Sequence, residues 1–141
     1  MKYVNWILVP IDFSEDSRIA LQTADNQADL WKTGLVLLHV KPSASSPRTR
    51  LSIEAGALER WGKYIQRTSL DNVAFLTCNG DAADEILRVA EQYRPRKIIM
   101  GHGGDSFQPG SVTQAVGEGF PGVVEAVSQT ADDVYTHPSV A

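Results

Sequence analysis

The stretch "WILVPIDFSEDSRIAL", residues 6–21, joins an apolar run to the start of a helix. Its first part, residues 6–11, is almost continuously apolar, as in a parallel strand that is covered on both faces. Ser14 stands where a helix N-cap is expected, and Glu15 and Asp16 match the positive end of the helix dipole. The stretch therefore predicts a buried strand that leads directly into a capped helix.

The same alternation recurs along the chain. Three further apolar runs predict buried strands: residues 35–40, 73–78 and 97–101. Helical patterns fill the intervals, with one helix that ends at Gly34, one over about 50–68 and one from Asp81 to Pro95. Strands that alternate with helices form a parallel sheet, so we expect one α/β domain over residues 1–141.

The pattern is less regular near the end of the chain. "SVTQAV" (111–116) predicts the start of a helix, which "GEGFPG" (117–122) interrupts. "VVEAVSQTADD" (123–133) has a helical pattern, and "VYTHP" (134–138) predicts a polar, weak fifth strand. Pro138 fits only a sheet edge or a strand end, because it has no N–H group to donate.

Composition excludes several classes of protein. A net charge of −4 provides no large basic surface, so we expect no nucleic-acid partner. The single cysteine, Cys78, excludes an internal disulfide and a zinc site built from cysteines. No apolar run approaches the ~18 residues of a membrane span, and the N-terminus lacks the pattern of a signal peptide. We therefore expect a cytoplasmic protein without a membrane partner.

Candidate site residues follow the predicted strands. Ligands of open α/β sheets bind beyond the carboxyl ends of the strands, where the strand order reverses. Asp12 follows the first strand, and its carboxylate could accept hydrogen bonds from a ribose or instead satisfy amides of its own turn. His39 near the end of the second strand is interpreted as a structural histidine with a hydrogen-bond partner.

The glycine-rich loop "GHGG" (101–104) follows the fourth strand. Its glycines permit positive φ angles and close approach of backbone N–H groups to an anion. Ser111 and Thr113, at the start of the following helix, could add hydroxyl and amide donors. A tight turn would use the same glycines, so the loop alone does not distinguish a phosphate site from a turn. It is neither a P-loop, which requires Gly-Lys-Ser/Thr, nor the dinucleotide fingerprint, which follows the first strand.

A catalytic constellation is not evident in the sequence. It contains no Gly-x-Ser-x-Gly nucleophile elbow and no His-x-x-x-His pair for a metal ion. The sequence therefore favours binding over catalysis.

Four segments together resemble the universal stress protein family: "ILVPIDFSEDSRIAL", "LVLLHV", "GDAADEIL" and "KIIMGHGG…GSVTQAV". The resemblance covers about residues 4–116. It implies a Rossmann-like parallel sheet of five strands in the order 3-2-1-4-5, flanked by helices, and a homodimer through the C-terminal edge strand. Some members of the family bind AMP, or ATP with Mg²⁺, and others bind no nucleotide. The usual role is regulation or protection under stress.

The resemblance also implies a set of nucleotide-binding residues. The Asp12 carboxylate would meet the ribose or the adenine edge, and the Val40 backbone would meet the adenine. Gly101 and Gly104 match a Gly-x-x-Gly motif, and Gly110 with Ser111 matches the Gly-Ser that opens the last helix. The full set is Pro10, Ile11, Asp12, Val40, Met100, Gly101, Gly104, Gly110, Ser111, Val112 and Thr113.

The phosphate loop departs from the family pattern. Only Asp105 to Pro109 separate Gly104 from Gly110, where the pattern has nine residues. In a second alignment, Gly122 starts the last helix, which restores the distance to the last strand but loses the serine. Asp105 stands where a basic residue is frequent, so AMP or adenosine should bind at least as well as ATP. Two functions remain: a stress-response regulator that binds an adenine nucleotide, and a nucleotide-free dimeric interaction or scaffold protein with a degenerate phosphate loop.

Overall fold

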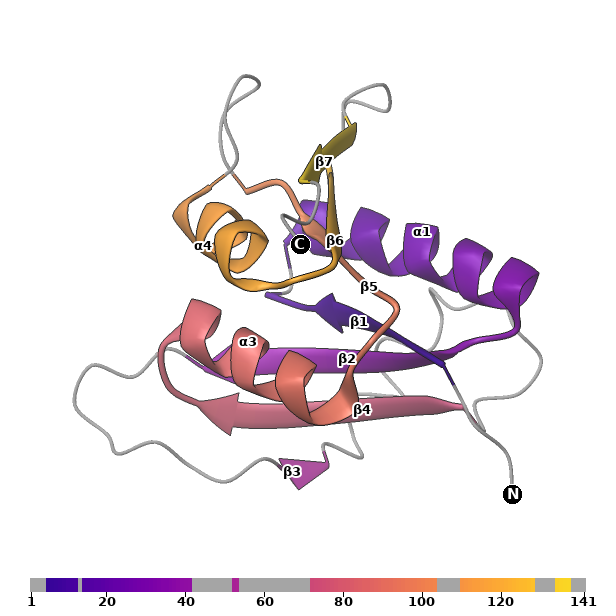
Figure 1. The fold of residues 1–141 in the computed structure, drawn as a ribbon, viewed down its shortest axis with the longest axis horizontal. Coiled ribbons are helices and arrows are strands. Elements are labelled where there is room, and N and C mark those ends of the chain that lie inside the picture. Colours follow the sequence, from indigo (N-terminus) through magenta and orange to yellow (C-terminus); the bar gives the residue numbers. More distant parts are fainter. Residues whose placement is uncertain are drawn as a thin grey trace.

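A computed structural model describes residues 5–12, 14–41, 52–53, 72–103, 110–128 and 134–137. The described strands form one sheet in the order β3-β4-β2-β1-β5-β6-β7 (Figure 1). The strands are β1 (Trp6–Pro10), β2 (Gly34–Lys41), β3 (Ser52–Ile53), β4 (Val73–Asn79), β5 (Lys97–Gly101), β6 (Val123–Val127) and β7 (Val134–His137). The helices are α1 (Glu15–Trp31), α3 (Ala82–Tyr93) and α4 (Ser111–Gly119).

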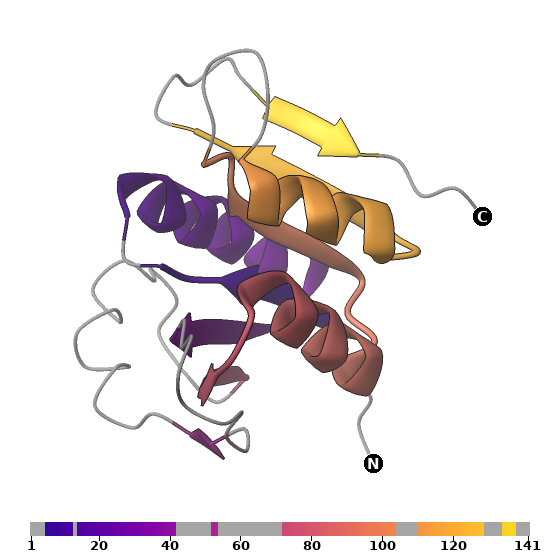
Figure 2. The same ribbon diagram turned by 90° about the vertical axis from the view of Figure 1, so that its left-hand side faces the viewer.

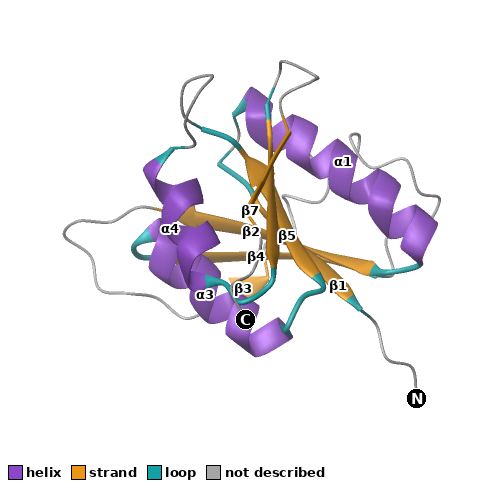
Figure 3. Ribbon diagram, turned by 45° about the horizontal axis from the view of Figure 1, so that its top comes forward, coloured by secondary structure: helices purple, strands orange, loops and turns teal. Residues whose placement is uncertain are grey.

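Five of these strands, β4-β2-β1-β5-β6, are parallel and form the predicted 3-2-1-4-5 arrangement. Strand β1 is at the centre, where Leu8 pairs with Val36 of β2 and with Ile98 of β5. Figure 3 shows the strands between α1 on one side and α3 and α4 on the other. Ile7 and Val9 pack into the core under α1, while Leu8 packs into the core under α3 and α4. Burial on both faces explains why this strand is continuously apolar.

The starts of α1 and α3 follow the predicted local signals, but the prediction that Gly34 ends the first helix was wrong, because α1 ends at Trp31 and Gly34 is the first residue of β2. Ser14 caps α1 by accepting a hydrogen bond from Ser17 N, and Asp81 caps α3 in the same way from Asp84 N. Both helices end in the left-handed conformation, at Lys32 (φ 58°) and Arg94 (φ 49°). Among the described residues, no helix combines the length and the apolar character that crossing a membrane requires.

The prediction of a helix over 123–133 was wrong for its first part. Residues Val123–Val127 form β6, which pairs in parallel with β5 along its whole length. The open edge of β5 offers a row of backbone groups, and this pairing outweighs the weak helical pattern. Strand β6 is therefore the fifth parallel strand, in place of residues 134–138. Gly122 precedes this strand, whereas Gly110 is the N-cap of α4, which decides between the two alignments.

Two segments add antiparallel strands at the sheet edges. Strand β7 lies beside β6, with His137 paired to Val124 (the yellow arrow in Figure 2). Strand β3 pairs with the outer edge of β4, so the predicted helix over 50–68 was wrong at Ser52 and Ile53. Unpaired backbone groups at the edge of β4 favour this pairing. The rest of that predicted helix lies outside the described residues.

Candidate functional site

A cavity of about 250 Å³ opens at the carboxyl ends of β1, β2 and β5, beside the first turns of α1 and α4. Strands β2 and β4 lie on one side of β1, and strands β5 and β6 lie on its other side. The cavity therefore lies at the point where the strand order reverses, which we call the switch point. Open α/β sheets bind their ligands at this position.

The cavity brings together ten of the predicted site residues: Pro10, Ile11, Asp12, Val40, Met100, Gly101, Gly110, Ser111, Val112 and Thr113. The eleventh, Gly104, and the neighbouring Asp105 lie outside the described residues. Sequence reasoning missed six lining residues, Ser14, Asp16, Ser17, Leu38, Ala82 and Ile86, and it had placed a seventh, Gly103, in the glycine-rich loop. The floor is apolar, with Ile11, Val40, Ile86 and Met100 each at most 9% exposed. Such a floor suits a flat apolar ring better than a charged group.

Asp12 is held by its own turn. Its Oδ1 atom accepts hydrogen bonds from Ser14 N (3.0 Å) and from the Ser17 hydroxyl (2.5 Å). The Ser17 Oγ atom also accepts a hydrogen bond from Asp12 N at 2.9 Å, which closes a ring between the two residues. These contacts with described residues use Oδ1 and not Oδ2. Asp12 thus satisfies local groups, as one interpretation of the sequence expected.

The pKa of Asp12 is lowered below its ordinary value of 3.8. Partial burial alone would raise this pKa, but the hydrogen bonds from Ser14 and Ser17 outweigh that effect. Hydrogen bonds to the charged form of a carboxyl group favour ionisation. Asp12 is therefore a carboxylate at neutral pH, suited to accept hydrogen bonds from ribose hydroxyls.

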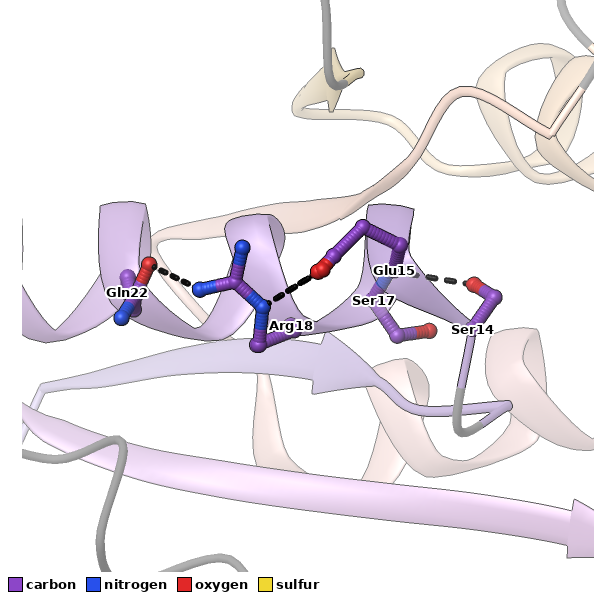
Figure 4. Close-up of polar contacts among 5 residues, drawn as sticks. All are labelled: Ser14, Glu15, Ser17, Arg18 and Gln22. Carbon is purple, nitrogen blue, oxygen red and sulfur yellow. Dashed lines mark hydrogen bonds and ion pairs between the residues drawn. The ribbon is translucent and has the colours of Figure 1, made fainter.

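Ser17 is the buried support of this arrangement, with 3% of its surface exposed. Figure 4 shows its N–H group directed to the oxygen of Ser14, within the first turn of α1. The spacing of Asp12, Ser14 and Ser17 is visible in the sequence. Its significance is not, because Ser17 reads equally well as an ordinary polar residue in an amphipathic helix.

His39 has the structural role that the sequence predicted. Its Nδ1 atom lies 2.8 Å from the carbonyl oxygen of Ile11. A carbonyl only accepts, so Nδ1 carries the hydrogen. The contact ties β2 to the residue that follows β1, directly before Asp12.

The glycine-rich loop contacts the start of α4. The Thr113 hydroxyl donates a hydrogen bond to the Gly101 carbonyl at 2.9 Å, so its hydrogen atom is already used within the protein. Among the described glycines of this loop, Gly103 has a positive φ angle (73°), whereas Gly101 allows the close approach of α1. Gly110 is the N-cap of α4, and it makes no side-chain capping hydrogen bond. The first N–H groups of a helix have no partner within it, so this end of the cavity can receive an acceptor.

An acidic side chain lies at the same end of the cavity. The Oδ2 atom of Asp16 accepts a hydrogen bond from Gly103 N at 3.4 Å. The sequence had assigned Asp16 to the helix dipole alone. Within the described ranges, no group of three or more His, Cys, Asp or Glu side chains gathers into a metal site.

Comparisons with known proteins show the family of this chain. The model of the universal stress protein family matches residues 5–124. The chain belongs to the universal stress protein family. The family resemblance of the sequence is thereby confirmed. No curated protein shows a significant match.

Solved universal stress proteins share the fold. UspA from Lactobacillus plantarum is 21% identical, with a TM-score of 0.69 over 91% of this chain and 99% of its own. A universal stress protein in complex with cAMP is 15% identical, with a TM-score of 0.68 over 89% and 98% of the two chains. The universal stress protein from Archaeoglobus fulgidus in complex with dAMP is 16% identical, with a TM-score of 0.55 over 82% and 90%.

Proposed function

We propose that this universal stress protein is a cytoplasmic stress-response regulator that binds an adenine nucleoside or nucleotide in the cavity at the switch point. The observation that carries the proposal is the ionised Asp12 carboxylate in the lining of a cavity whose other lining residues include buried apolar side chains. The adenine ring would lie on Ile11, Val40 and Met100, with its edge on the backbone of Val40. The ribose hydroxyls would donate to Asp12. AMP and ATP with Mg²⁺ are the candidate nucleotides.

Two of the structurally similar universal stress proteins were solved with adenine compounds, cAMP and dAMP. Gly101, Gly110, Ser111, Val112 and Thr113 would form the phosphate end of the site, with Gly104. The binding energy would come mostly from burial of the ring and from charge-assisted hydrogen bonds to Asp12. Ligand binding, rather than turnover, would change the protein's assembly or its partners.

The test is direct. Purified protein is denatured, and the released small molecules are separated and identified by mass spectrometry, while the ligand-free protein is titrated with adenosine, AMP and Mg-ATP by calorimetry. The proposal expects an adenine compound in the first experiment or saturable binding in the second. Absence of both would leave the nucleotide-free alternative.

The alternative is a dimeric interaction or scaffold protein that binds no nucleotide. The observation in its favour is that the charged side chains among the described lining residues are both acidic, Asp12 and Asp16. A phosphate chain would meet no basic side chain in this part of the cavity. A dimer that binds none of the three compounds would support this alternative.

A further inference from the structure

Another cavity, of about 220 Å³, lies at the amino ends of β1, β5 and β6, whereas the switch point lies at the carboxyl ends of the strands. Lys97 pairs with Ile7 of β1 on one side and with Val123 of β6 on the other, so these three residues form one row across the sheet. Two residues of α1 and one that precedes β5 complete the lining, which consists of Ile7, Gln27, Trp31, Arg96, Lys97 and Val123. This cavity shares no lining residue with the one at the switch point.

Two large apolar side chains at the end of α1 are exposed beside this cavity. Trp31, which lines it, is 53% exposed, and Leu30 is 78% exposed. Leu30 follows the lining residue Gln27 by three positions, so the two are neighbours on the helix surface. Apolar side chains exposed together mark interaction sites, whereas scattered single ones are ordinary. A small ligand inside the cavity would leave Leu30 uncovered, so the exposed pair fits a larger partner.

The guanidinium group of Arg96 stacks on the exposed indole, with Cζ 4.0 Å from the centroid of the Trp31 ring. Stacking uses the flat face of the guanidinium group and leaves its N–H donors, which lie in its plane, for an acceptor. Among the described residues, no carboxylate forms an ion pair with Arg96. The stack also holds the group in place, which lowers the entropy lost when a partner binds.

The charge of the other basic lining residue is already balanced. Lys97 Nζ donates to Glu125 Oε1 at 2.7 Å and to Gln27 Oε1 at 2.9 Å. Gln27 Nε2 in turn donates to Glu125 Oε1 at 3.2 Å, which closes a network between α1, β5 and β6. The positive charge that this lining offers to a partner is therefore that of Arg96, and the exposed Lys32 adds another directly after α1.

We propose that the surface formed by Leu30, Trp31, Lys32, Arg96 and the adjoining cavity docks an acidic peptide segment of a partner protein. An apolar side chain of this segment packs on the two exposed apolar residues and enters the cavity, while an Asp or Glu carboxylate accepts a pair of hydrogen bonds from Arg96. Trp and Arg are enriched among the residues that dominate binding energy at protein interfaces. The inference goes beyond the proposed function, because it concerns a partner protein at the other end of the strands.

The charges favour a peptide over a nucleic acid. A nucleic acid is held by basic side chains that follow its row of phosphates. This surface offers Arg96 and Lys32, and the chain as a whole has a net charge of −4. A peptide carboxylate needs only one guanidinium group as its partner.

The experiment selects peptides from a displayed library of random sequences against the full chain. The selected peptides are then synthesised with a fluorescent label, and their binding is measured by anisotropy. Wild type is compared with Arg96→Gln, Trp31→Ala and the control Lys41→Gln. Lys41 is an exposed basic residue at the carboxyl end of β2, outside the cavity, so the control makes the same change of charge as Arg96→Gln.

The selected peptides should combine Asp or Glu with a large apolar residue. Arg96→Gln and Trp31→Ala should each weaken their binding about tenfold or more, which corresponds to at least about 1.4 kcal/mol. The control should stay within about twofold of wild type, because exposed charges far from the site are screened by salt. Peptides with Asn or Gln in place of the acidic residues should bind wild type more weakly and should lose little more with Arg96→Gln, because the same contact is then removed twice.

Several results would overturn the proposal. The selection could yield no peptides or peptides without acidic residues, or Arg96→Gln could bind the acidic peptides as tightly as wild type does. Tighter binding of a single-stranded oligothymidylate than of any peptide would identify a nucleic-acid site instead. Loss of a wild-type dimer in Trp31→Ala, measured by sedimentation, would show that a second copy covers this surface. Urea unfolding checks that each variant folds, and if Trp31→Ala does not, Arg96→Gln and the amide peptides decide the outcome.

Discussion

Gly101 and Asp16 approach so closely that a Cβ atom on the glycine would lie 2.8 Å from the Cβ atom of the aspartate. The backbone carbonyl carbon of Asp16 and the nitrogen of Ser17 would follow at 3.2 and 3.3 Å. Real Cβ atoms do not approach other atoms this closely, so any larger residue at 101 must push α1 away from β5. The contact joins the two elements on which the site depends.

Gly101→Ala should therefore lower the free energy of unfolding by about 1–3 kcal/mol, the usual cost of overpacking a core. Urea unfolding measures the change. Gly119→Ala is the matched control, because its Cβ atom would meet the end of the Leu87 side chain, which can rotate. The control should cost less than about 1 kcal/mol. If both variants lose the same free energy of unfolding, the contact between α1 and β5 is no more tightly packed than the contact of Gly119 with Leu87.

Asp12→Ala should weaken adenosine binding by about 1–3 kcal/mol, since a hydrogen bond to a charged group is lost. Calorimetry on folded protein measures the affinity. Asp29→Ala removes an exposed carboxylate from α1 without touching the cavity, and it should bind adenosine like wild type. An Asp12→Ala protein with wild-type affinity would remove Asp12 from the site.

Asp12 should also contribute to the pH dependence of stability. Its pKa is lower in the folded protein than the ordinary value of 3.8, so the unfolded chain binds the proton more tightly. The stabilising contribution is then complete above the unfolded pKa and is lost as the pH falls through the folded pKa. Asp12→Asn lacks this contribution. Its unfolding free energy should fall less steeply than that of wild type below about pH 4, and the two curves should converge. Parallel curves between about pH 3 and pH 7 would contradict the role of the hydrogen bonds from Ser14 and Ser17.

The edge strand β7 should support a homodimer. It pairs with β6 on one side, and it is the last strand of the described sheet. An open edge presents backbone groups that a second copy can pair with. We expect a dimer in sedimentation experiments at tens of micromolar, and a changed assembly after truncation from Val134. A wild-type monomer that truncation does not alter would exclude this dimer.

The centre of the fold was predictable because its signals are local. Strand β1 is apolar on both faces, and Ser14 and Asp81 mark helix starts by their own chemistry. The identity of β6 was not predictable in this way. Residues Val123–Val127 have a pattern that fits a helix or a strand, and the open edge of β5 decides the outcome. Such long-range pairing leaves no mark in the segment itself.

The site residues also divide into those with a local sequence signal and those that depend on long-range packing. Asp12 was found because it directly follows the first apolar run, whereas Gly110 came from the family resemblance, which left Gly122 as an alternative. The contact between Asp16 and Gly103 joins residues 87 positions apart, and it depends on the tight packing of α1 against β5. Ser17 was missed for a related reason, since its hydroxyl is buried by the fold of the turn and not by an apolar pattern.

The carbonyl of His102 accepts a hydrogen bond from Gly110 N at 2.9 Å, and His102 N donates to the carbonyl of Val127 at 2.7 Å. These two backbone hydrogen bonds of His102 thus hold the chain where it leaves β5 and where it enters α4. The number of residues between these two ends can change at little cost, because the entropy of closing a loop grows slowly with its length. We therefore expect that a change in the number of residues between His102 and Gly110 leaves the start of α4 where it is.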